Sequence, residues 1–205
     1  MGSASRGSPL WAITSYFNPA GYTRRLANYR RFRRSLAVPL VAVELSFGDG
    51  FALGPGDADV LVQVRGGDVM WQKERLLNLA VARLPGDCEY VAWIDCDVVF
   101  GDDDWPERAR RAFRKHVLLQ FFEERCDLPR DVDPDHAGEH PGAPRAESVA
   151  TRIFRGTAGP EELYGAESPF QRGSTAGLAW ACRREVVERH GIFDPCILGN
   201  GDRAI

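Results

Sequence analysis

The hydrophobic positions along this chain follow two alternating spacings. Near-continuous apolar stretches predict β-strands at residues 10–17, 39–47, 59–66, 89–100 and 117–124. Between them, apolar side chains recur at helical spacing and predict helices at residues 21–36, 71–84 and 105–116, the second of which stops at Pro85-Gly86. This alternation of strand and helix predicts a three-layer α/β fold with a mostly parallel central sheet.

The segment 126–170 departs from this pattern. It is rich in Pro, Gly, Asp and Glu, has little periodicity and is too long for an ordinary loop, so we expect an insert that is flexible or ordered by a ligand. Residues 174–195 predict a strand or turn that leads into a helix ended by Gly191. The last residues, 197–205, predict a loop that opens a further helix, so we expect the natural protein to continue past Ile205.

Composition narrows the class of protein. A chain of 205 residues that is 44% hydrophobic and has no internal repeat predicts a single domain over residues 1–205. The formal net charge is only −3, and lysine occurs only at positions 73 and 115, so the overall charge does not favour a nucleic-acid partner. The five cysteines lack any C-x-x-C spacing and predict neither a disulfide framework nor a zinc site. Without a signal-like segment or a membrane-length apolar run, we expect a soluble cytoplasmic protein with no membrane span.

Two carboxylates interrupt the apolar stretch 89–100. Asp95 and Asp97 are two residues apart, so in a strand their side chains lie on one side while Cys96 points to the other. Two like charges beside buried apolar residues need compensation, which a divalent cation provides. The alternative is a solvated turn at the end of the strand, in which the pair binds nothing.

The type of cation suggests the type of ligand. Mg²⁺ and Mn²⁺ prefer oxygen ligands, and Mg²⁺ is commonly held by one or two carboxylates together with substrate phosphates. In open α/β sheets, ligands bind beyond the carboxyl ends of the strands where the strand order reverses. The sequence has neither a G-x-x-x-x-G-K-[ST] phosphate loop nor a G-x-G-x-x-G motif after its first strand, which argues against the usual kinases and dehydrogenases.

Several segments together resemble a known family. The strand ending in Asp-x-Asp, "WIDCDVVF", resembles the hallmark of glycosyltransferases with the GT-A fold, which bind Mn²⁺ or Mg²⁺ and a sugar nucleotide there. "WQKERLLNLA" and "TAGLAWACRREVVERHGIFD" are similar to segments that flank this motif in galactosyltransferase-type members (family 7-like or family 2-like). The resemblance implies a three-layer, Rossmann-like GT-A domain that transfers a sugar from a nucleotide diphosphate sugar, first of all a UDP-sugar, to a glycan or other hydroxyl acceptor.

The resemblance also implies roles for individual residues. Asp95 and Asp97 would hold the metal and the donor diphosphate, and Asp202, in "LGNGDRAI", would be the general base of the catalytic loop. Further donor-binding candidates are Thr14, Tyr16 and Asn18 near the end of the first strand, with Glu44 and Arg75; acceptor-binding candidates are Gly177 and Trp180. Each of these has an ordinary structural alternative: strand-end, core or bend residues, a surface charge for Arg75, and a helix cap for Asp202.

Other interpretations stay open. A sugar-phosphate nucleotidyltransferase would use a related sheet, and a non-catalytic nucleotide-sugar or glycan-binding module would keep the acidic pair without turnover. The arginines at 24, 25, 30, 31, 33 and 34 could bind RNA or an anionic membrane, although on an amphipathic helix they more often form an exposed face, with one arginine near the helix N-terminus available to a phosphate. The cluster "DVDPDHAGEH" at 131–140 could be a second metal site, but a solvated loop is the stronger reading because no apolar element fixes its geometry.

Overall fold

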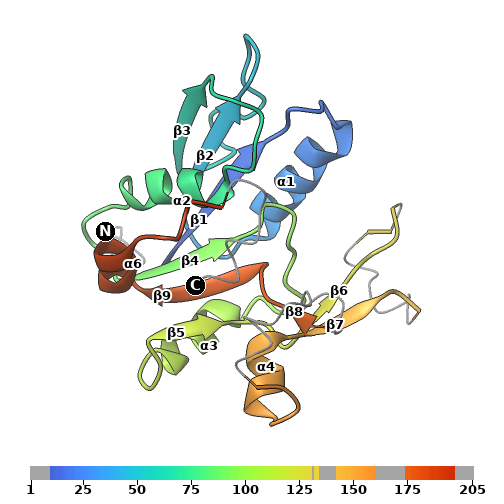
Figure 1. Cartoon of the computed structure of the whole chain (residues 1–205), viewed down its shortest axis with the longest axis vertical. Coiled ribbons are helices and arrows are strands. Elements are labelled where there is room, and N and C mark those ends of the chain that lie inside the picture. The colour runs from blue at the N-terminus through green and yellow to red at the C-terminus, as the bar shows by residue number, and fades with distance from the viewer. Residues whose placement is uncertain (1–9, 131, 134–141, 160–173, 197–205) are drawn as a thin grey trace, which may run out of the picture.

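A six-stranded sheet forms the centre of the fold (Figure 1). The computed structural model describes residues 10–130, 132–133, 142–159 and 174–196. The strand order is β3-β2-β1-β4-β9-β5. In chain order these strands are β1 (Leu10–Phe17), β2 (Leu40–Ser46), β3 (Val60–Arg65), β4 (Tyr90–Ile94), β5 (Leu118–Gln120) and β9 (Ala179–Arg183).

The sheet is mostly parallel, as predicted. β1 pairs in parallel with both β2 and β4, and β2 pairs in parallel with β3. β9 is antiparallel to both β4 and β5, so it alone runs against the other strands. The predicted α/β class and the predominantly parallel sheet are therefore confirmed.

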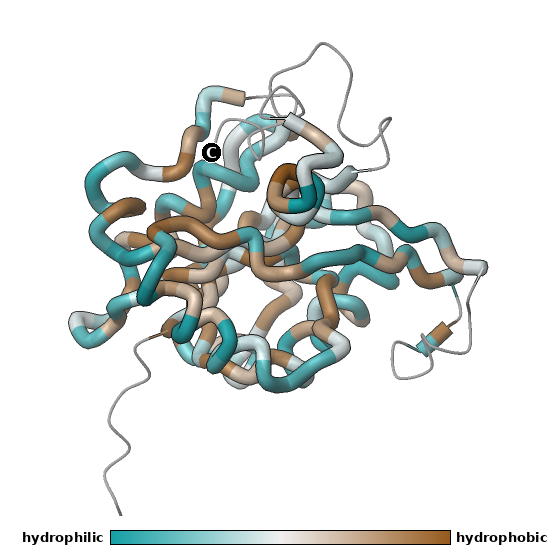
Figure 2. Tube along the Cα trace, turned by 90° about the horizontal axis from the view of Figure 1, so that it is seen from below, coloured by the Kyte–Doolittle hydropathy of each residue, from teal (hydrophilic) through white to brown (hydrophobic). Residues whose placement is uncertain are grey.

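Helices cover both faces of the sheet and complete three layers. The helices of these layers are α1 (Thr23–Ser35), α2 (Lys73–Val81), α3 (Trp105–Ala112) and α6 (Arg184–His190). Side chains alternate along β1, so Ala12 and Tyr16 pack in the cluster that contains residues of α1 and α3, while Ile13 and Phe17 pack with α2 and α6. Hydrophobic residues lie mainly along the central strands, and many outer turns are hydrophilic (Figure 2).

The chain reverses its direction of travel across the sheet at β1. The crossover through α1 places β2 on one side of β1, and the crossover through α2 places β4 on the other side. α1 and α2 contribute to different core clusters on opposite faces. The carboxyl ends of β1 and β4 therefore flank the switch point at which α/β proteins bind their ligands.

The predicted strand 117–124 is in fact two short strands in different sheets. β5 ends at Gln120, and β6 (Glu124–Cys126) joins a second sheet with β7 (Arg145–Ser148) and β8 (Ser174–Thr175). Between the two strands, Phe121 stacks against Trp105 and Phe100, with ring centroids 5.1 and 5.5 Å apart. The Phe121 N–H still donates to the Ala179 carbonyl of β9 at 3.4 Å, so the chain leaves β9 only after Phe121, which the apolar run alone did not reveal.

Part of the segment 126–170 has regular structure that its composition did not predict. β7 runs directly into the short helix α4 (Val149–Phe154). The side chain of Ser148 caps this helix by accepting a hydrogen bond of 3.1 Å from the Thr151 backbone N–H. None of the helices in the described ranges is both long and apolar enough to span a bilayer.

Candidate functional site

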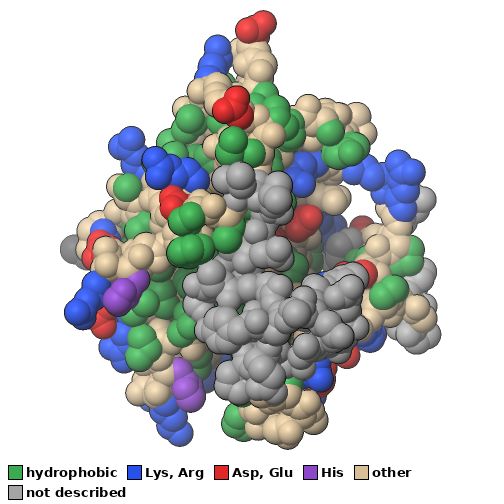
Figure 3. Space-filling view, in the orientation of Figure 1, with side chains coloured by type: hydrophobic (Ala, Val, Ile, Leu, Met, Phe, Trp, Pro, Cys, Tyr) green, Lys and Arg blue, Asp and Glu red, His purple; other side chains and the backbone are tan. Residues whose placement is uncertain are grey.

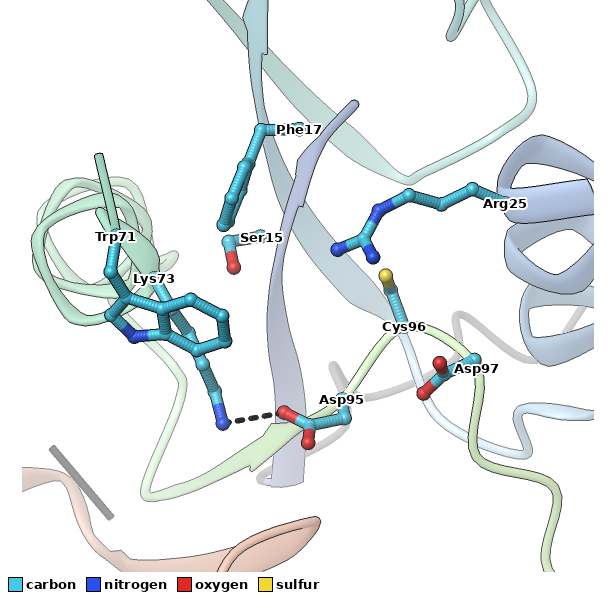
Figure 4. Close-up of a pocket in the computed structure, with 8 residues that line it drawn as sticks. All are labelled: Ser15, Phe17, Arg25, Trp71, Lys73, Asp95, Cys96 and Asp97. Carbon is cyan, nitrogen blue, oxygen red and sulfur yellow. Dashed lines mark ion pairs between the residues drawn. The ribbon is translucent and has the colours of Figure 1, made fainter. Parts of the chain in front are cut away.

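A pocket lies at the switch point between β1 and β4. Its lining comes from the end of β1, from α1, from the start of α2 and from the turn after β4. The lining residues are Ser15, Phe17, Arg25, Trp71, Lys73, Asp95, Cys96 and Asp97 (Figure 4). Charged side chains from α1, from α2 and from the turn after β4 therefore meet where the topology predicts a ligand.

The acidic pair occupies the turn that follows β4. Strand pairing stops at Ile94, so Asp95 and Asp97 are not inside a strand as the apolar stretch had predicted. Two backbone hydrogen bonds hold the turn: Asp95 N–H donates to the Leu178 carbonyl at 2.8 Å, and Val98 N–H donates to the Asp95 carbonyl at 3.1 Å. The turn gives both carboxylates access to solvent, while Cys96 between them is buried.

The environment of Asp97 disfavours its negative charge. The surrounding protein displaces much of the water that would solvate this carboxylate, although the residue stays accessible from one side. This desolvation, and secondarily the like charge of Asp95, raise the pKa of Asp97, while Arg25 and Lys73 oppose the shift. A cation bound beside Asp97 would oppose this shift, because it would stabilise the ionised carboxylate.

Two basic side chains reach the acidic turn from opposite sides of β1 (Figure 4). Lys73, the first residue of α2, is buried, and its Nζ lies 2.6 Å from Oδ1 of Asp95. Arg25 extends from α1, and its guanidinium carbon lies 5.4 Å from the centre of the Phe17 ring. Two carboxylates and two cations thus share one pocket.

An aromatic wall borders the charged groups. The rings of Phe17 and Trp71 meet edge to face with their centroids 5.9 Å apart. The indole N–H of Trp71 donates to a carboxylate oxygen of Glu74 at 2.9 Å, which fixes the orientation of the ring. Because Trp71 remains 39% exposed, part of the ring is accessible to a ligand.

The three donor candidates at or just past the end of the first strand lie outside the pocket lining. The Thr14 hydroxyl is buried and donates to the Ile94 carbonyl at 2.7 Å, so it supports the base of the acidic turn. Tyr16 packs against Tyr29 in the core, where burial raises its pKa. Asn18 exchanges two side-chain hydrogen bonds of 3.0 Å with the backbone of Tyr22 and orders the connection to α1. The pocket is lined instead by Ser15 and Phe17, whose side chains alternate along β1 with those of Thr14 and Tyr16.

Glu44 is a buried carboxylate on β2 that stabilises a loop. Its oxygens accept hydrogen bonds from the backbone N–H groups of Ala52 at 2.6 Å and Leu53 at 3.1 Å. The side-chain amide of Gln63 donates to it as well, at 3.1 Å. The structure does not bring Glu44 to the pocket lining.

Arg75 lies outside the pocket lining, whereas Lys73 on the same helix contacts the acidic turn. The Arg75 side chain is 70% exposed and pairs with Asp194 at 3.3 Å. Lys73 had a sequence signal of its own, because it is one of only two lysines in an Arg-rich chain and begins the helix before the acidic motif. Arg25 lies in the first turn of α1, where one arginine was expected to be available to a phosphate, whereas Ser15, Phe17 and Trp71 had no comparable signal.

The acceptor candidates lie around the start of β9. Trp180 is buried, and its indole N–H donates to the Ala176 carbonyl at 2.7 Å. The carbonyl of Gly177 accepts from the Gln120 amide at 3.3 Å. The neighbouring Leu178 has a positive φ of 78° and carries the carbonyl that binds Asp95 N–H, so this loop touches the acidic turn through its backbone.

Two predicted features fall partly or wholly outside the described residues. Asp202 lies outside them, and of the acidic and histidine residues in "DVDPDHAGEH" only Asp133 is described, where it pairs with Arg31 at 2.9 Å. Within the described ranges, no group of three or more His, Cys, Asp or Glu side chains is arranged to hold a metal ion. Within the described ranges, an ion bound by Asp95 and Asp97 would therefore have no third His, Cys, Asp or Glu side chain as a ligand, and its other ligands would be of another kind.

The arginines of α1 make contacts within the protein. Arg30 pairs with Asp57 at 3.6 Å, Arg33 pairs with Asp59 at 2.9 Å, and Arg24 donates to the Arg130 carbonyl. On the face shown in Figure 3, basic side chains form several separate groups with acidic side chains among them. This pattern fits an exposed helix face better than a continuous nucleic-acid surface.

All five cysteines are free thiols.

Comparisons with known proteins give information on the fold alone. The sequence matches no family model and no curated protein significantly. Among solved structures, residues 1–349 of S. aureus TarS superpose with a TM-score of 0.50 at 15% identity, covering 95% of this chain and 52% of that one. This chain thus spans about half the length of the TarS structure. The likeness agrees with the predicted three-layer GT-A architecture.

Two further structures are more distant. Mannosyltransferase PcManGT from Pyrobaculum calidifontis, solved with GDP-Man and Mn²⁺, gives a TM-score of 0.45 at 16% identity, over 91% of this chain and 48% of that one. The 4-diphosphocytidyl-2C-methyl-D-erythritol synthase of Anaerococcus prevotii DSM 20548 gives 0.44 at 10% identity, over 95% and 80%. Because both scores lie below 0.5, neither structure distinguishes a glycosyltransferase from a nucleotidyltransferase.

Proposed function

We propose that this chain is the donor-binding domain of a glycosyltransferase, which moves a sugar from a nucleotide diphosphate sugar to a hydroxyl acceptor with the help of Mn²⁺ or Mg²⁺. The observation that carries the proposal is the acidic turn Asp95–Asp97 at the switch point, flanked by Lys73 and Arg25. A site that presents two carboxylates and two cations together suits a ligand that brings both charges, namely a diphosphate with its metal ion.

The acidic turn fits a hard divalent cation. Mg²⁺ and Mn²⁺ prefer oxygen ligands, and Asp95 and Asp97 offer carboxylate oxygens with access to solvent. The pKa of Asp97 is raised by desolvation and secondarily by Asp95, and both effects would be opposed by a bound cation. With two protein carboxylates, the remaining ligands would be water and donor phosphate oxygens. Such an ion, when bound, stabilises negative charge on the departing diphosphate.

The other pocket residues can hold the rest of the donor. We assign the diphosphate contacts to Lys73 and Arg25 in place of Arg75, because Lys73 and Arg25 line the pocket and Arg75 does not. The exposed part of Trp71, braced by Phe17, offers a flat apolar surface on which a base or sugar ring can stack. The donor is first of all a UDP-sugar, as the sequence resemblance implies.

The transfer itself needs a proton acceptor on the side of the acceptor substrate. The acceptor hydroxyl oxygen bonds to the anomeric carbon of the sugar, the bond from that carbon to the diphosphate breaks, and the nucleoside diphosphate leaves with the electron pair. The hydroxyl proton passes to a base, for which we propose the carboxylate of Asp202. Gly177 and Trp180 belong to the loop and strand beside the acidic turn and remain the candidates for acceptor contacts.

A binding panel tests the proposal. The melting temperature would be measured with UDP, GDP, UDP-sugars, GDP-sugars and CTP, each with and without Mn²⁺. A ligand at 100 times its dissociation constant stabilises the folded state by about 2.7 kcal/mol. We expect this response for a nucleotide diphosphate or its sugar only when Mn²⁺ is present, followed by release of nucleoside diphosphate when acceptor glycans are added.

The other outcomes identify the rival functions. Preference for CTP or another triphosphate, with pyrophosphate released on adding a sugar phosphate, would replace this proposal with a nucleotidyltransferase. Tight donor binding without release of nucleoside diphosphate in any acceptor mixture would identify a binding module. No response to any nucleotide would remove the nucleotide site altogether.

A further inference from the structure

The ion pair between Lys73 and Asp95 occupies part of the proposed cation site. Lys73 Nζ lies 2.6 Å from Asp95 Oδ1, and the two side chains are only 10% and 28% exposed. Shielding from water strengthens the attraction between such charges relative to a surface pair. A divalent cation that approaches Asp95 therefore meets an ammonium group already bound to the same carboxylate.

The four charged side chains of the pocket also balance one another. Lys73 and Arg25 carry two positive charges, and Asp95 and Asp97 carry two negative charges when ionised. A divalent cation alone would leave excess positive charge, and a diphosphate alone would place negative charge beside the carboxylates. When both ligands bind together, their charges largely compensate each other.

We propose that Lys73 is an internal counter-ion for Asp95, which it releases for the donor diphosphate when the cation binds, so that cation and nucleotide bind cooperatively. This inference rests on the proposed function. A lysine suits the exchange because its ammonium is a compact charge with three donors on a flexible stem, so it can turn from a carboxylate to a phosphate oxygen while α2 stays in place.

The inference has a reciprocal consequence that can be measured. If nucleotide draws Lys73 away from Asp95, then nucleotide must tighten cation binding by the same factor by which the cation tightens nucleotide binding. Couplings between sites are typically 5- to 150-fold, so we expect UDP to tighten Mn²⁺ binding by at least about tenfold. Coordination of the ion by the diphosphate also couples the two ligands, so the contribution of Lys73 is the part of this coupling that is lost when Lys73 is replaced.

The decisive variant is Lys73→Met, which keeps an unbranched apolar stem and removes the charge. We expect it to bind Mn²⁺ alone at least about fivefold more tightly than the wild type, because no ammonium competes for Asp95. The same variant should bind UDP in the presence of Mn²⁺ more weakly, because a diphosphate contact is lost. This opposite change in the two affinities distinguishes competition from general damage to the pocket.

Lys115→Met is the matched control, since Lys115 is the only other lysine of the chain. Lys115 is exposed and lies in the connection between α3 and β5. β5 runs in the same direction as β4, so this connection reaches the sheet at the amino ends of its parallel strands, opposite the carboxyl ends of β1 and β4. The control removes the same charge and should bind Mn²⁺ and UDP as the wild type does. Lys73→Arg, which keeps a positive charge, should retain weak binding of Mn²⁺ alone.

The measurements are titration calorimetry with Mn²⁺ alone, UDP alone and each in the presence of the other. Unchanged or weaker binding of Mn²⁺ by Lys73→Met, with UDP binding intact in the wild type, would overturn this inference but not the proposed function. Absence of any nucleotide binding in the wild type would overturn both. If Lys73→Met does not fold, equal Mn²⁺ affinity of the wild type with and without UDP would suffice to overturn the inference.

Discussion

Replacing Asp97 with alanine should separate the stability of the fold from the response to ligand. Asp97 lies in a solvent-accessible turn, and its charge is disfavoured by desolvation and by Asp95. Removing the carboxylate therefore relieves repulsion in the unliganded protein, and we expect a melting temperature equal to or slightly above that of the wild type. The variant also loses one of the two carboxylates proposed to hold the cation.

The size of the effect follows from the ligand response. With nucleotide and Mn²⁺ at 100 times the dissociation constant, the wild type should gain about 2.7 kcal/mol. For a domain of 150–250 residues, 1 kcal/mol shifts the melting temperature by roughly 2–4 °C, so the gain corresponds to about 5–11 °C. If Asp97→Ala weakens binding about a hundredfold, the same ligand concentration leaves about 0.4 kcal/mol, or roughly 1–2 °C.

The assay is differential scanning fluorimetry with a nucleotide diphosphate at fixed concentration, with and without Mn²⁺. Asp103→Ala is the control, because it removes an exposed carboxylate a few residues further along the chain and outside the pocket lining. A full ligand response in Asp97→Ala would refute the metal assignment. An equal loss in Asp103→Ala would show that the response depends on overall charge and not on the acidic turn.

Three further predictions concern other parts of the chain. Glu44→Gln should lose roughly 1–3 kcal/mol in urea unfolding, since an amide cannot accept from Ala52 and Leu53 as the carboxylate does, and should keep its nucleotide-induced shift; loss of that shift alone would instead support donor binding. Burial raises the pKa of Cys88 to about 11 and of Cys182 to about 12. Because the folded-state values are raised, their stabilising contribution is complete below the unfolded pKa of about 8.5 and declines through the folded values, so the free energy of unfolding in reductant should fall as the pH rises above about 8.5. Replacing both with alanine should make this decline shallower, and the part that remains belongs to groups such as Cys96, whose pKa burial also raises to about 12. Asp202→Asn should keep stability and donor binding but lose at least about a hundredfold in turnover at saturating substrates; near-normal turnover would remove Asp202 from the mechanism.

The central sheet could be predicted from the sequence because burial on two faces leaves a strong local pattern. The strands at 10–17 and 39–47 and the helices around Phe32 and Leu76 are found within a few residues of their predicted limits. The error at 117–124 concerns strand pairing, since β5 ends after three residues and Glu124–Cys126 pairs with β7 in the second sheet. Local pattern contains no information about which of two sheets a strand residue will join.

The candidate site was predictable mainly in its acidic part, with one arginine near the start of the first helix. Asp95 and Asp97 could be identified because charge within an apolar stretch is unusual. Thr14 and Tyr16 were expected to contact the donor, but the pocket is lined by the intervening Ser15 and by Phe17, because the choice of face depends on where α1 and α2 pack. Arg75 and Lys73 are two residues apart on one helix, and only the structure shows which one turns toward the acidic turn.

The contacts around the acidic turn divide its surroundings into a fixed and an exchangeable part. Two hydrogen bonds hold the backbone of the turn in place: the Leu178 carbonyl accepts from Asp95 N–H, and the buried Thr14 hydroxyl donates to the Ile94 carbonyl. The charged groups that reach the pocket from the helices are the long cationic side chains of Lys73 and Arg25 (Figure 4). A long flexible stem lets a charged group change partners while its backbone stays in place. A metal site needs carboxylates held in place, whereas a site that admits and releases a diphosphate needs counter-charges that can change partners. This division of roles is why we place the energetic cost of binding the cation alone on the Lys73–Asp95 pair and not on a rearrangement of the turn.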